Sequence, residues 1–225
     1  MITFDEQLEL FKLIGKDLNN KVTCFAIGGN AMMFYGAKEE TKDIDLVFLN
    51  KKDLEEVKKV LYNSGFEDKK DLIKIFRHHE VIEKENMPVM MVMKEERIDL
   101  FVKGVITFEI SDTIDKRVKE THEFDNLIVK VVSPEDIILM KSATERKKDK
   151  IDALSLIEKF NINWDIIVEE SINQTKLERE LFPVFLYDFL TELKEDLKAD
   201  IPKEVINKVR DIGKAMMIKR LKKGK

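Results

Sequence analysis

The sequence predicts an α+β protein, with strands and helices in residues 1–160 and a helical region in residues 161–225. Two observations carry this prediction. Short apolar runs of strand length alternate with helical patterns as far as about residue 132, whereas the longer segments after Ser133 all have helical spacing. The segment Asn161-Ile162-Asn163 interrupts the helical pattern and marks the junction between the two predicted regions.

The composition is compatible with a packed core and a highly charged surface. Apolar residues make up 44% of the 225 residues, and charged residues make up 37%, above the roughly 25% usual in soluble domains. The formal net charge is only −4, which argues against a protein dedicated to coating nucleic acid and leaves room for a local basic patch. Lysine and glutamate abound while glutamine is found only at Gln7 and Gln174, a pattern typical of thermophile proteins.

The single cysteine, Cys24, excludes a disulfide within the chain and favours a reducing compartment. It lies in the apolar run 22–26, which favours a small buried hydrophobe over a catalytic thiol. The first residues lack the pattern of a signal peptide, and no apolar run approaches the ~18 residues of a membrane span. We therefore expect a cytoplasmic protein.

The first half of the chain reads as helices alternating with buried strands. Thr3 and Glu6 have the spacing of a capping box, and the apolar residues after them predict a helix that ends near residues 19–20. The patterns that follow predict a strand at 22–27, a short helix at 30–36, a strand at 43–49 and a helix at 51–63.

The second half begins with strands and ends with helices. Between about residues 66 and 132 the pattern favours strands, with a hairpin formed by 89–93 and 98–102 and a further strand at 127–132. Ser133-Pro134-Glu135-Asp136 combines a capping hydroxyl, a proline and two acids, which is typical of a helix start. The helices predicted after it are 134–145, 148–159, 164–174, 176–196 and 202–222.

Two aspartates one residue apart suggest a cation site. Asp43 and Asp45 lie at the start of a predicted strand, where side chains two residues apart point the same way. Ile44 and Leu46 then face the core, while both carboxylates face one space. Carboxylates this close repel unless a cation lies between them, and Mg²⁺ is commonly bound through one or two protein carboxylates. The alternative is a strand end with solvated acids.

The pair Gly28-Gly29 adds a place for a phosphate group. It follows one predicted strand and precedes a short helix, so the backbone is bare where a phosphate approaches and helix N–H groups are available. A glycine pair alone usually marks only a turn. Here a short helix leads from the pair to the strand of Asp43 and Asp45, so the two motifs can belong to one nucleotide site.

The combined pattern resembles that of the polymerase-beta-type nucleotidyltransferases, whose signature is Gly-Gly or Gly-Ser after an apolar residue, a short gap, and two acids flanking an apolar residue. Over roughly residues 20–160 the chain is most similar to a prokaryotic branch that includes toxin–antitoxin-associated members. The motifs that carry this resemblance are Ile27-Gly28-Gly29-Asn30-Ala31, Gly36 and Thr41-Lys42-Asp43-Ile44-Asp45.

The resemblance implies a small mixed β-sheet flanked by helices and a reaction in which a nucleoside monophosphate passes from an NTP to a hydroxyl acceptor with Mg²⁺, or Mn²⁺. It implies Asp43 and Asp45 as catalytic metal ligands. It also implies a third catalytic carboxylate on a later strand, which Asp99 fits, to complete the metal site and help to activate the attacking hydroxyl. Asp99 lies inside an apolar strand, an expensive place for a charge that is neither paired nor coordinating. The alternative for Asp99 is an edge-strand acid paired with Arg97.

The resemblance also implies nucleotide contacts from the glycine turn, from the loop before the acids and from two later lysines, namely Gly28, Gly29, Asn30, Thr41, Lys42, Lys141 and Lys148. Lys141 matches a helix lysine that faces the phosphates in similar proteins. For Lys148 and Arg146, solvated charges at a helix–helix turn are an equal alternative, and Asp149 and Asp152 are expected to organise that turn.

One position departs from the resemblance. Related sequences usually have arginine two residues before the threonine of Thr-Lys-Asp, where this chain has Glu39, although Lys38 or Lys42 can supply positive charge nearby. This departure motivates a rival prediction, a catalytically silent binding module of antitoxin-like type. A second rival is nucleic-acid binding through the basic segments 146–150 and 219–225, and such binding falls steeply with salt.

The acceptor is left open by the sequence. An RNA 3′ end, a protein hydroxyl and a small molecule such as an aminoglycoside all fit the predicted reaction. The helical region 161–225 is expected to shape acceptor choice or to form a homodimer surface through an apolar stripe of its last helix, Val205, Ile206, Val209 and Ile212. Packing of that stripe inside one chain is the alternative.

Overall fold

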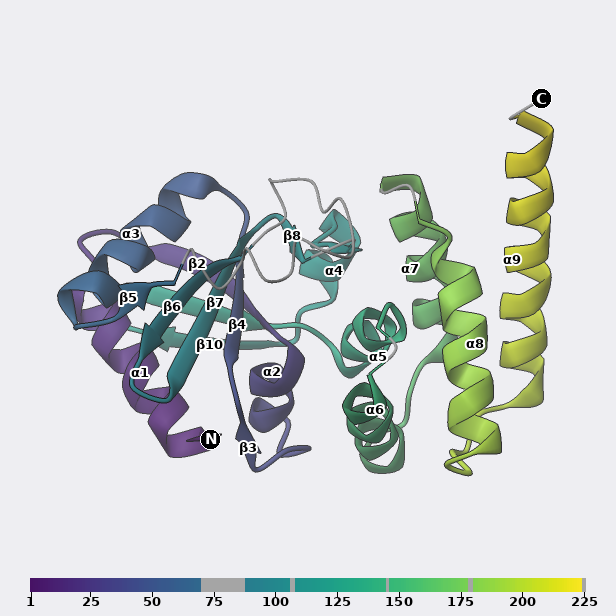
Figure 1. The fold of residues 1–225 in the computed structure, drawn as a ribbon, viewed down its shortest axis with the longest axis horizontal. Helices are drawn as coiled ribbons and strands as arrows, with labels where there is room; N and C mark the ends of the chain where they lie inside the picture. The colour runs from purple at the N-terminus through teal and green to yellow at the C-terminus, as the bar shows by residue number, and fades with distance from the viewer. Residues whose placement is uncertain (70–87, 106–107, 145, 178–179, 224–225) are drawn as a thin grey trace. The chain divides into compact units, whose positions relative to one another are not determined.

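The fold is taken from a computed structural model, which describes residues 1–69, 88–105, 108–144, 146–177 and 180–223. By the contacts within the chain, the protein divides into two compact units, residues 1–133 and 134–225. The first unit contains the sheet and the second is helical (Figure 1). The domain boundary near residue 160 that the sequence predicts stays a prediction.

A mixed sheet of seven strands forms the centre of the first unit. The pairs β11–β2 and β4–β7 are parallel, and the other neighbouring strands are antiparallel. This arrangement confirms the predicted small mixed sheet flanked by helices. The strands follow one another across the sheet in the order β10 (Glu120–Phe124), β11 (Leu127–Val131), β2 (Val22–Ile27), β4 (Ile44–Phe48), β7 (Glu96–Val102), β6 (Val89–Met93) and β5 (Glu67–Asp68).

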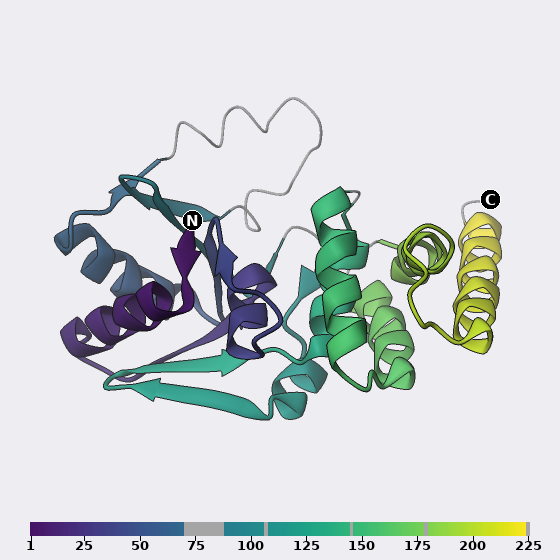
Figure 2. The same ribbon diagram turned by 90° about the horizontal axis from the view of Figure 1, so that it is seen from below.

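Helices α1 (Phe4–Asp17), α2 (Gly28–Phe34) and α3 (Lys51–Asn63) pack against the sheet (Figure 2). Thr3 and Glu6 form the predicted capping box at the start of α1, and Asn50 caps α3. The shorter elements of this unit are α4 (Asp112–Arg117), the strand pair β1 (Ile2–Thr3) with β3 (Glu40–Thr41), and the strand pair β8 (Gly104–Val105) with β9 (Phe108–Glu109).

The central strands are buried on both faces, which is why they read as continuous apolar runs. Phe25, Leu46 and Leu100 on β2, β4 and β7 are fully buried. Cys24 on β2 is a buried free thiol, and burial raises the pKa of Cys24. The predicted structural role of this residue agrees with its position.

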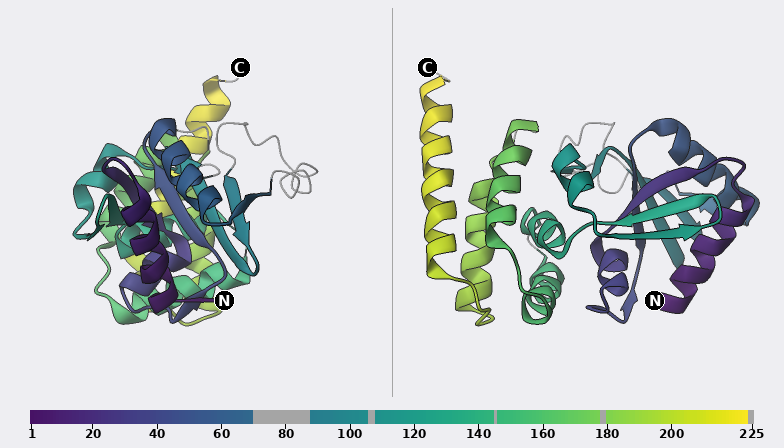
Figure 3. Two further views of the ribbon diagram at one scale, coloured as in Figure 1. Left: turned by 90° about the vertical axis from the view of Figure 1, so that its left-hand side faces the viewer. Right: turned by 180° about the vertical axis from the view of Figure 1, so that it is seen from behind.

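The second unit consists of helices α5 (Pro134–Ser142), α6 (Lys147–Lys159), α7 (Trp164–Leu177), α8 (Phe182–Glu195) and α9 (Lys203–Lys223). Helix α9 runs alongside α8 (Figure 3), and α8 also contacts α5, α6 and α7. The buried side chains at this centre include Leu156, Phe182, Leu186, Leu190 and Val209. Val209 belongs to the stripe for which a homodimer was predicted; it is buried within the chain, whereas the other three residues of the stripe are partly exposed, and the homodimer stays a prediction.

The helix predicted over residues 176–196 is wrong. Helix α7 ends at Leu177 and α8 begins at Phe182, with non-helical backbone at residues 180 and 181. Pro183 explains the new start, because proline is well tolerated in the first turn of a helix and poorly in its interior.

The basic segment 219–225, for which nucleic-acid binding was a rival prediction, lies at the end of α9. Its last two residues, 224 and 225, lie outside the described ones.

Two further differences concern the first unit. Helix α2 begins at Gly28 rather than at residue 30, so the glycine pair forms its first turn. The region 66–132 also contains α4, which the strand prediction for that region did not include. Among the helices in the described ranges, none combines the length and the apolar character needed to cross a membrane.

Candidate functional site

Two of the three predicted acids lie side by side on neighbouring strands. Asp45 on β4 is the register partner of Asp99 on the parallel strand β7, and Ile27 at the end of β2 is the partner of Asp45 on its other side. Asp43 comes directly before β4. Asp43 and Asp45 are partly exposed, while Asp99 is only 4% exposed. The sheet therefore gathers acids that are far apart in the sequence.

The glycine pair is adapted to close approach on both of its positions. Gly28 has a φ of 61°, and a Cβ atom there would lie 2.7 Å from the Asp45 carboxylate oxygen Oδ2. A Cβ atom on Gly29 would lie 2.4 Å from Thr41 Oγ1 and 3.6 Å from the Lys38 side chain. Real Cβ atoms do not approach other atoms to 2.7 or 2.4 Å, so the first turn of α2 needs glycine to pack against Asp45 and Thr41.

The Asn30 side chain is bonded to the backbone of β4, the strand that carries Asp45. Its side-chain oxygen Oδ1 accepts a hydrogen bond from the backbone N–H of Asp45 at 3.1 Å. Gln7 on α1 donates from Nε2 to the Asn30 carbonyl at 3.4 Å. Both side chains are completely buried. Asn30, which was predicted to contact phosphate, thus holds the strand of Asp45 in place. Its contact with phosphate stays a prediction.

The sequence analysis did not single out Gln7 as a site residue. A usable signal was present, because Gln7 shares the helical face of Phe11 and Ile14, where an apolar residue is expected. Three buried polar atoms around this turn have no hydrogen-bond partner in the described structure, namely Gln7 Oε1, Asn30 Nδ2 and Thr41 Oγ1. Buried polar groups are normally satisfied, so these atoms mark a place where a polar ligand or water fits.

Asp99 pairs with Arg97, as the alternative prediction holds, but on an inner strand rather than an edge strand. Arg97 Nε donates to Asp99 Oδ1 at 2.8 Å, and Arg97 Nη2 donates to Asp99 Oδ2 at 2.5 Å. The guanidinium therefore engages both carboxylate oxygens. The two residues are two positions apart on β7, so their side chains share one face of the strand.

Electrostatics at Asp99 are unfavourable to its charged form despite this pair. Burial is the largest influence and raises the pKa of Asp99, the nearby charge of Asp43 raises it further, and the bonds from Arg97 oppose both without reversing them. The hydrogen bonds to Asp99 raise the pKa of Arg97, so the guanidinium stays charged. A buried carboxyl with an upward shift beside other acids is typical of functional sites.

The donor set has the chemistry of a Mg²⁺ site. Asp43 and Asp45 supply hard oxygen ligands, and Mg²⁺ commonly takes only one or two carboxylates from a protein and completes its shell with water and phosphate. Within the described ranges, no three or more His, Cys, Asp or Glu side chains are arranged to hold a metal. Both oxygens of Asp99 accept hydrogen bonds from Arg97. Asp43 and Asp45 are thus the two donors whose chemistry fits a metal ion, and the predicted metal role of Asp99 stays a prediction.

Lys141 lies in the second unit and is bound to two acids of the next helix. Its Nζ atom donates to Asp149 Oδ1 at 2.9 Å and to Asp152 Oδ2 at 2.7 Å. Arg146 Nε and Thr144 Oγ1 donate to the other oxygen of Asp149 at 2.7 and 2.5 Å. The acids organise the turn between α5 and α6 as expected. The phosphate contact of Lys141 stays a prediction.

The remaining predicted nucleotide contacts are exposed. Lys42 lies in the bend between β3 and Asp43, and Lys148 lies on α6. Glu39, which stands where related sequences have arginine, is also exposed. Of the neighbouring lysines, Lys38 has its side chain against Gly29, so it is well placed to add positive charge at the glycine turn.

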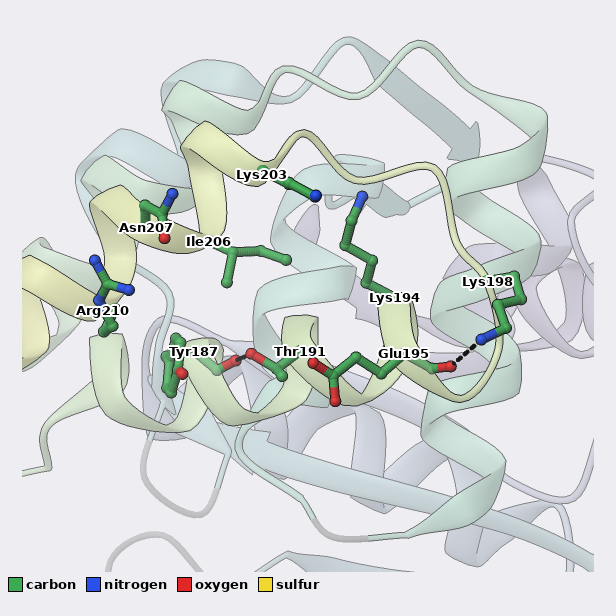
Figure 4. Close-up of a pocket in the computed structure, with 9 residues that line it drawn as sticks. All are labelled: Tyr187, Thr191, Lys194, Glu195, Lys198, Lys203, Ile206, Asn207 and Arg210. Carbon is green, nitrogen blue, oxygen red and sulfur yellow. Dashed lines mark hydrogen bonds between the residues drawn. The ribbon is translucent and has the colours of Figure 1, made fainter.

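A pocket of about 410 Å³ lies between α8 and α9 in the second unit (Figure 4). None of the predicted site residues lines it. Two of its lysines are already bound to backbone carbonyls, Lys194 to that of Ile201 and Lys198 to that of Glu195, and Arg210 pairs with Asp211. The pocket therefore holds less available positive charge than its lining suggests.

Comparison with known proteins gives matches of two kinds. Similar solved structures include ANT(2")-Ia in complex with adenylyl-2"-tobramycin, at 14% identity and a TM-score of 0.45, with 83% of this chain and 96% of that chain covered. Another is an antigenic nucleotidyltransferase-like protein from Paracoccidioides brasiliensis, at 18% identity and a TM-score of 0.39, with 70% and 78% covered. No curated protein matches the chain. The family model described as "Nucleotidyltransferase of unknown function (DUF6036)" matches residues 1–192.

Proposed function

Since the chain belongs to this family of nucleotidyltransferases, we propose that it transfers a nucleoside monophosphate from an NTP to a hydroxyl acceptor with the help of Mg²⁺, or Mn²⁺. The observation that carries the proposal is the pairing of Asp45 and Asp99 on two neighbouring strands beside a glycine turn, with Asp43 directly before the strand of Asp45. Family membership supports nucleotidyl transfer, and the acids add the reason for a divalent cation.

Each motif has a part in the proposed reaction. Asp43 and Asp45 would hold the metal ion, which would neutralise the triphosphate and polarise the α-phosphate when bound. The first turn of α2, at Gly28 and Gly29, brings bare backbone toward the phosphates. Asp99, beside Asp45, accepts the proton of the acceptor hydroxyl, and its raised pKa suits it to a base.

The reaction is a displacement at the α-phosphorus. The acceptor oxygen forms a new bond to the α-phosphorus, and the bond to the oxygen bridging the α- and β-phosphates breaks. Pyrophosphate leaves with that oxygen, and the hydroxyl proton passes to Asp99. The acceptor is an RNA end, a protein hydroxyl or a small-molecule hydroxyl, each compatible with this chemistry.

The first test measures nucleotide binding. An Asp43→Asn/Asp45→Asn double variant should lose ATP affinity in Mg²⁺ by about tenfold or more, because the metal that bridges protein and triphosphate loses its ligands. Asp115→Asn is the matched control, since Asp115 is an aspartate of the same unit that pairs with Lys130 at 2.5 Å. Calorimetry with each of the four NTPs gives the comparison. Equal affinity in the double variant and in the control would refute the metal assignment.

A second candidate function is a nucleotide-binding module without catalysis. It is favoured by one observation, the bidentate hold of Arg97 on Asp99, which occupies the carboxylate that the reaction needs. Incubation of the protein with radiolabelled NTPs and a panel of RNA, protein and aminoglycoside acceptors separates the two. Transfer of label that is lost in an Asp45→Asn variant excludes the silent module, and bound but untransferred NTP favours it.

A further inference from the structure

Arg97 differs from an ordinary partner in a buried ion pair because its side chain reaches solvent. Its side chain is 35% exposed, whereas that of Asp99 is 5% exposed. The carboxylate is thus fixed in the sheet, and the guanidinium that covers it reaches solvent. Neither bond to Asp99 involves the backbone of Arg97, so the side chain can swing away without disturbing the ladder of β7.

Arg97 also interacts with all three acids of the site. After the hydrogen bonds to Asp99, the charges of Asp43 and Asp45 help to raise the pKa of Arg97. Three carboxylates this close repel one another, and a cation among them offsets the repulsion. In the protein alone, the guanidinium therefore occupies the electrostatic role that a divalent ion takes in the proposed reaction.

We propose that Arg97 is a resident cation that exchanges partners during loading of the site: the divalent metal displaces it from Asp99, and the freed guanidinium then binds the phosphates of the nucleotide. This rests on the proposed function, because it assumes a metal–nucleotide complex at Asp43 and Asp45. A planar guanidinium matches a phosphate as well as it matches a carboxylate, which makes the exchange chemically simple. Asp99 becomes available when the metal takes the place of Arg97, and the nucleotide phosphates then hold the freed guanidinium.

The exchange predicts opposite effects on two affinities in one variant. Arg97→Gln should bind Mn²⁺ about tenfold more tightly than the wild type without nucleotide, because a charge-assisted pair no longer has to be broken. The same variant should bind the non-hydrolysable analogue α,β-methylene ATP about tenfold more weakly in saturating Mg²⁺, because a charge-assisted phosphate contact is lost. Electron paramagnetic resonance measures the first affinity and calorimetry the second.

Two further variants make the result specific. Arg97→Lys keeps the charge but loses the bidentate fork, so both affinities should lie between those of the wild type and Arg97→Gln. It also serves if Arg97→Gln does not fold. Arg210→Gln removes an arginine from an exposed pair with Asp211 and should leave both affinities unchanged.

Each outcome has a distinct meaning. Tighter Mn²⁺ with weaker analogue supports the exchange. Weaker binding of both, or no change in either, overturns it in favour of a structural Arg97. Tighter Mn²⁺ with unchanged analogue affinity overturns the transfer to phosphate. If the wild type binds no Mn²⁺ with or without the analogue, the proposed function itself fails, and the exchange fails with it.

Discussion

Two clusters of opposite charges, one in each unit, look alike in the sequence and differ in the structure. In the first unit Arg97 binds Asp99 within strand β7. In the second unit Lys141 on α5 binds Asp149 and Asp152 on α6. Each cluster has a basic residue, a deeply buried carboxylate and short hydrogen bonds. The sequence suggested a functional role for a member of each.

The clusters differ in which partner reaches solvent. The Lys141, Asp149 and Asp152 side chains are 7%, 4% and 9% exposed, so the cation is as enclosed as the acids. Around Asp99 the cation remains open to solvent. The acids respond oppositely. Although burial acts to raise it, Lys141 and the neighbouring donors lower the pKa of Asp149, whereas burial prevails at Asp99 and the pKa of Asp99 is raised.

The comparison teaches how to tell a structural ion pair from one poised for exchange. A pair that satisfies its acid completely and encloses its cation holds two helices together. In the other kind of pair, the pKa of the acid stays raised and the cation is accessible to solvent. A ligand that binds such an acid or such a cation can stabilise it further. By this criterion Arg97 and Asp99 suit the proposed site, whereas Lys141 joins α5 to α6, and its predicted phosphate contact stays a prediction.

The largest expected effect separates the two cations by stability. Lys141→Met removes the buried cation that binds both Asp149 and Asp152, and breaking a buried pair in this way costs about 3–5 kcal/mol of the free energy of unfolding. Arg97→Met should cost clearly less free energy of unfolding. The Arg97 side chain is 35% exposed, so water screens its pair with Asp99 more than it screens the enclosed pairs of Lys141. Urea unfolding of both variants at pH 7 makes the measurement. A smaller loss for Lys141→Met than for Arg97→Met would reverse the comparison.

A smaller effect is expected in the pH dependence of the stability that Asp149 provides. Because the pKa of Asp149 is lower in the folded protein than its ordinary value of 3.8, its stabilisation is present above that value and is lost as the pH falls through the lowered pKa. The difference in stability between the wild type and Asp149→Asn should therefore be full at pH 7 and shrink below about pH 4. Urea midpoints measured from pH 7 to pH 2.5 follow it. A difference that is independent of pH would contradict the assignment.

The smallest effect is at Asp99 and has the opposite sign. Since the pKa of Asp99 is raised in the folded state, folding disfavours its ionised form, and a neutral residue of the same shape relieves that cost at neutral pH. Asp99→Asn should unfold at an equal or slightly higher temperature than the wild type, while it abolishes any transfer of nucleotide. A clear drop in the melting temperature would mean that Asp99 is structural, like Asp149.

Much of this architecture was predictable from local patterns. The capping box of Thr3 and Glu6, the helix over 51–63 and the hairpin around β6 and β7 all depend on neighbouring residues, and the structure confirms them. Strand β10 was not predicted, because it alternates charged and partly buried residues at the edge of the sheet. Local spacing carries no warning of such an edge strand.

The site was predictable in its residues and less so in its pairings. Family resemblance and spacing pointed to Asp43, Asp45 and Asp99, but the neighbouring positions of β4 and β7 are a non-local fact of the sheet. The partner of Lys141 shows the limit most clearly. Asp149 and Asp152 were expected to organise a turn, yet the sequence alone did not reveal that they do so by enclosing Lys141.

The shared register of Asp45 and Asp99 makes the distance between the acids a property of the backbone. Side-chain changes nearby leave that spacing intact, whereas one residue inserted into β7 ahead of Asp99 would turn its carboxylate to the opposite face of the sheet. The turn between β6 and β7, where Lys94 already has a φ of 54°, can absorb such a change outside the ladder. The spacing between Asp45 and Asp99 should therefore tolerate side-chain changes on the strands around them, and changes of length at the turn between β6 and β7.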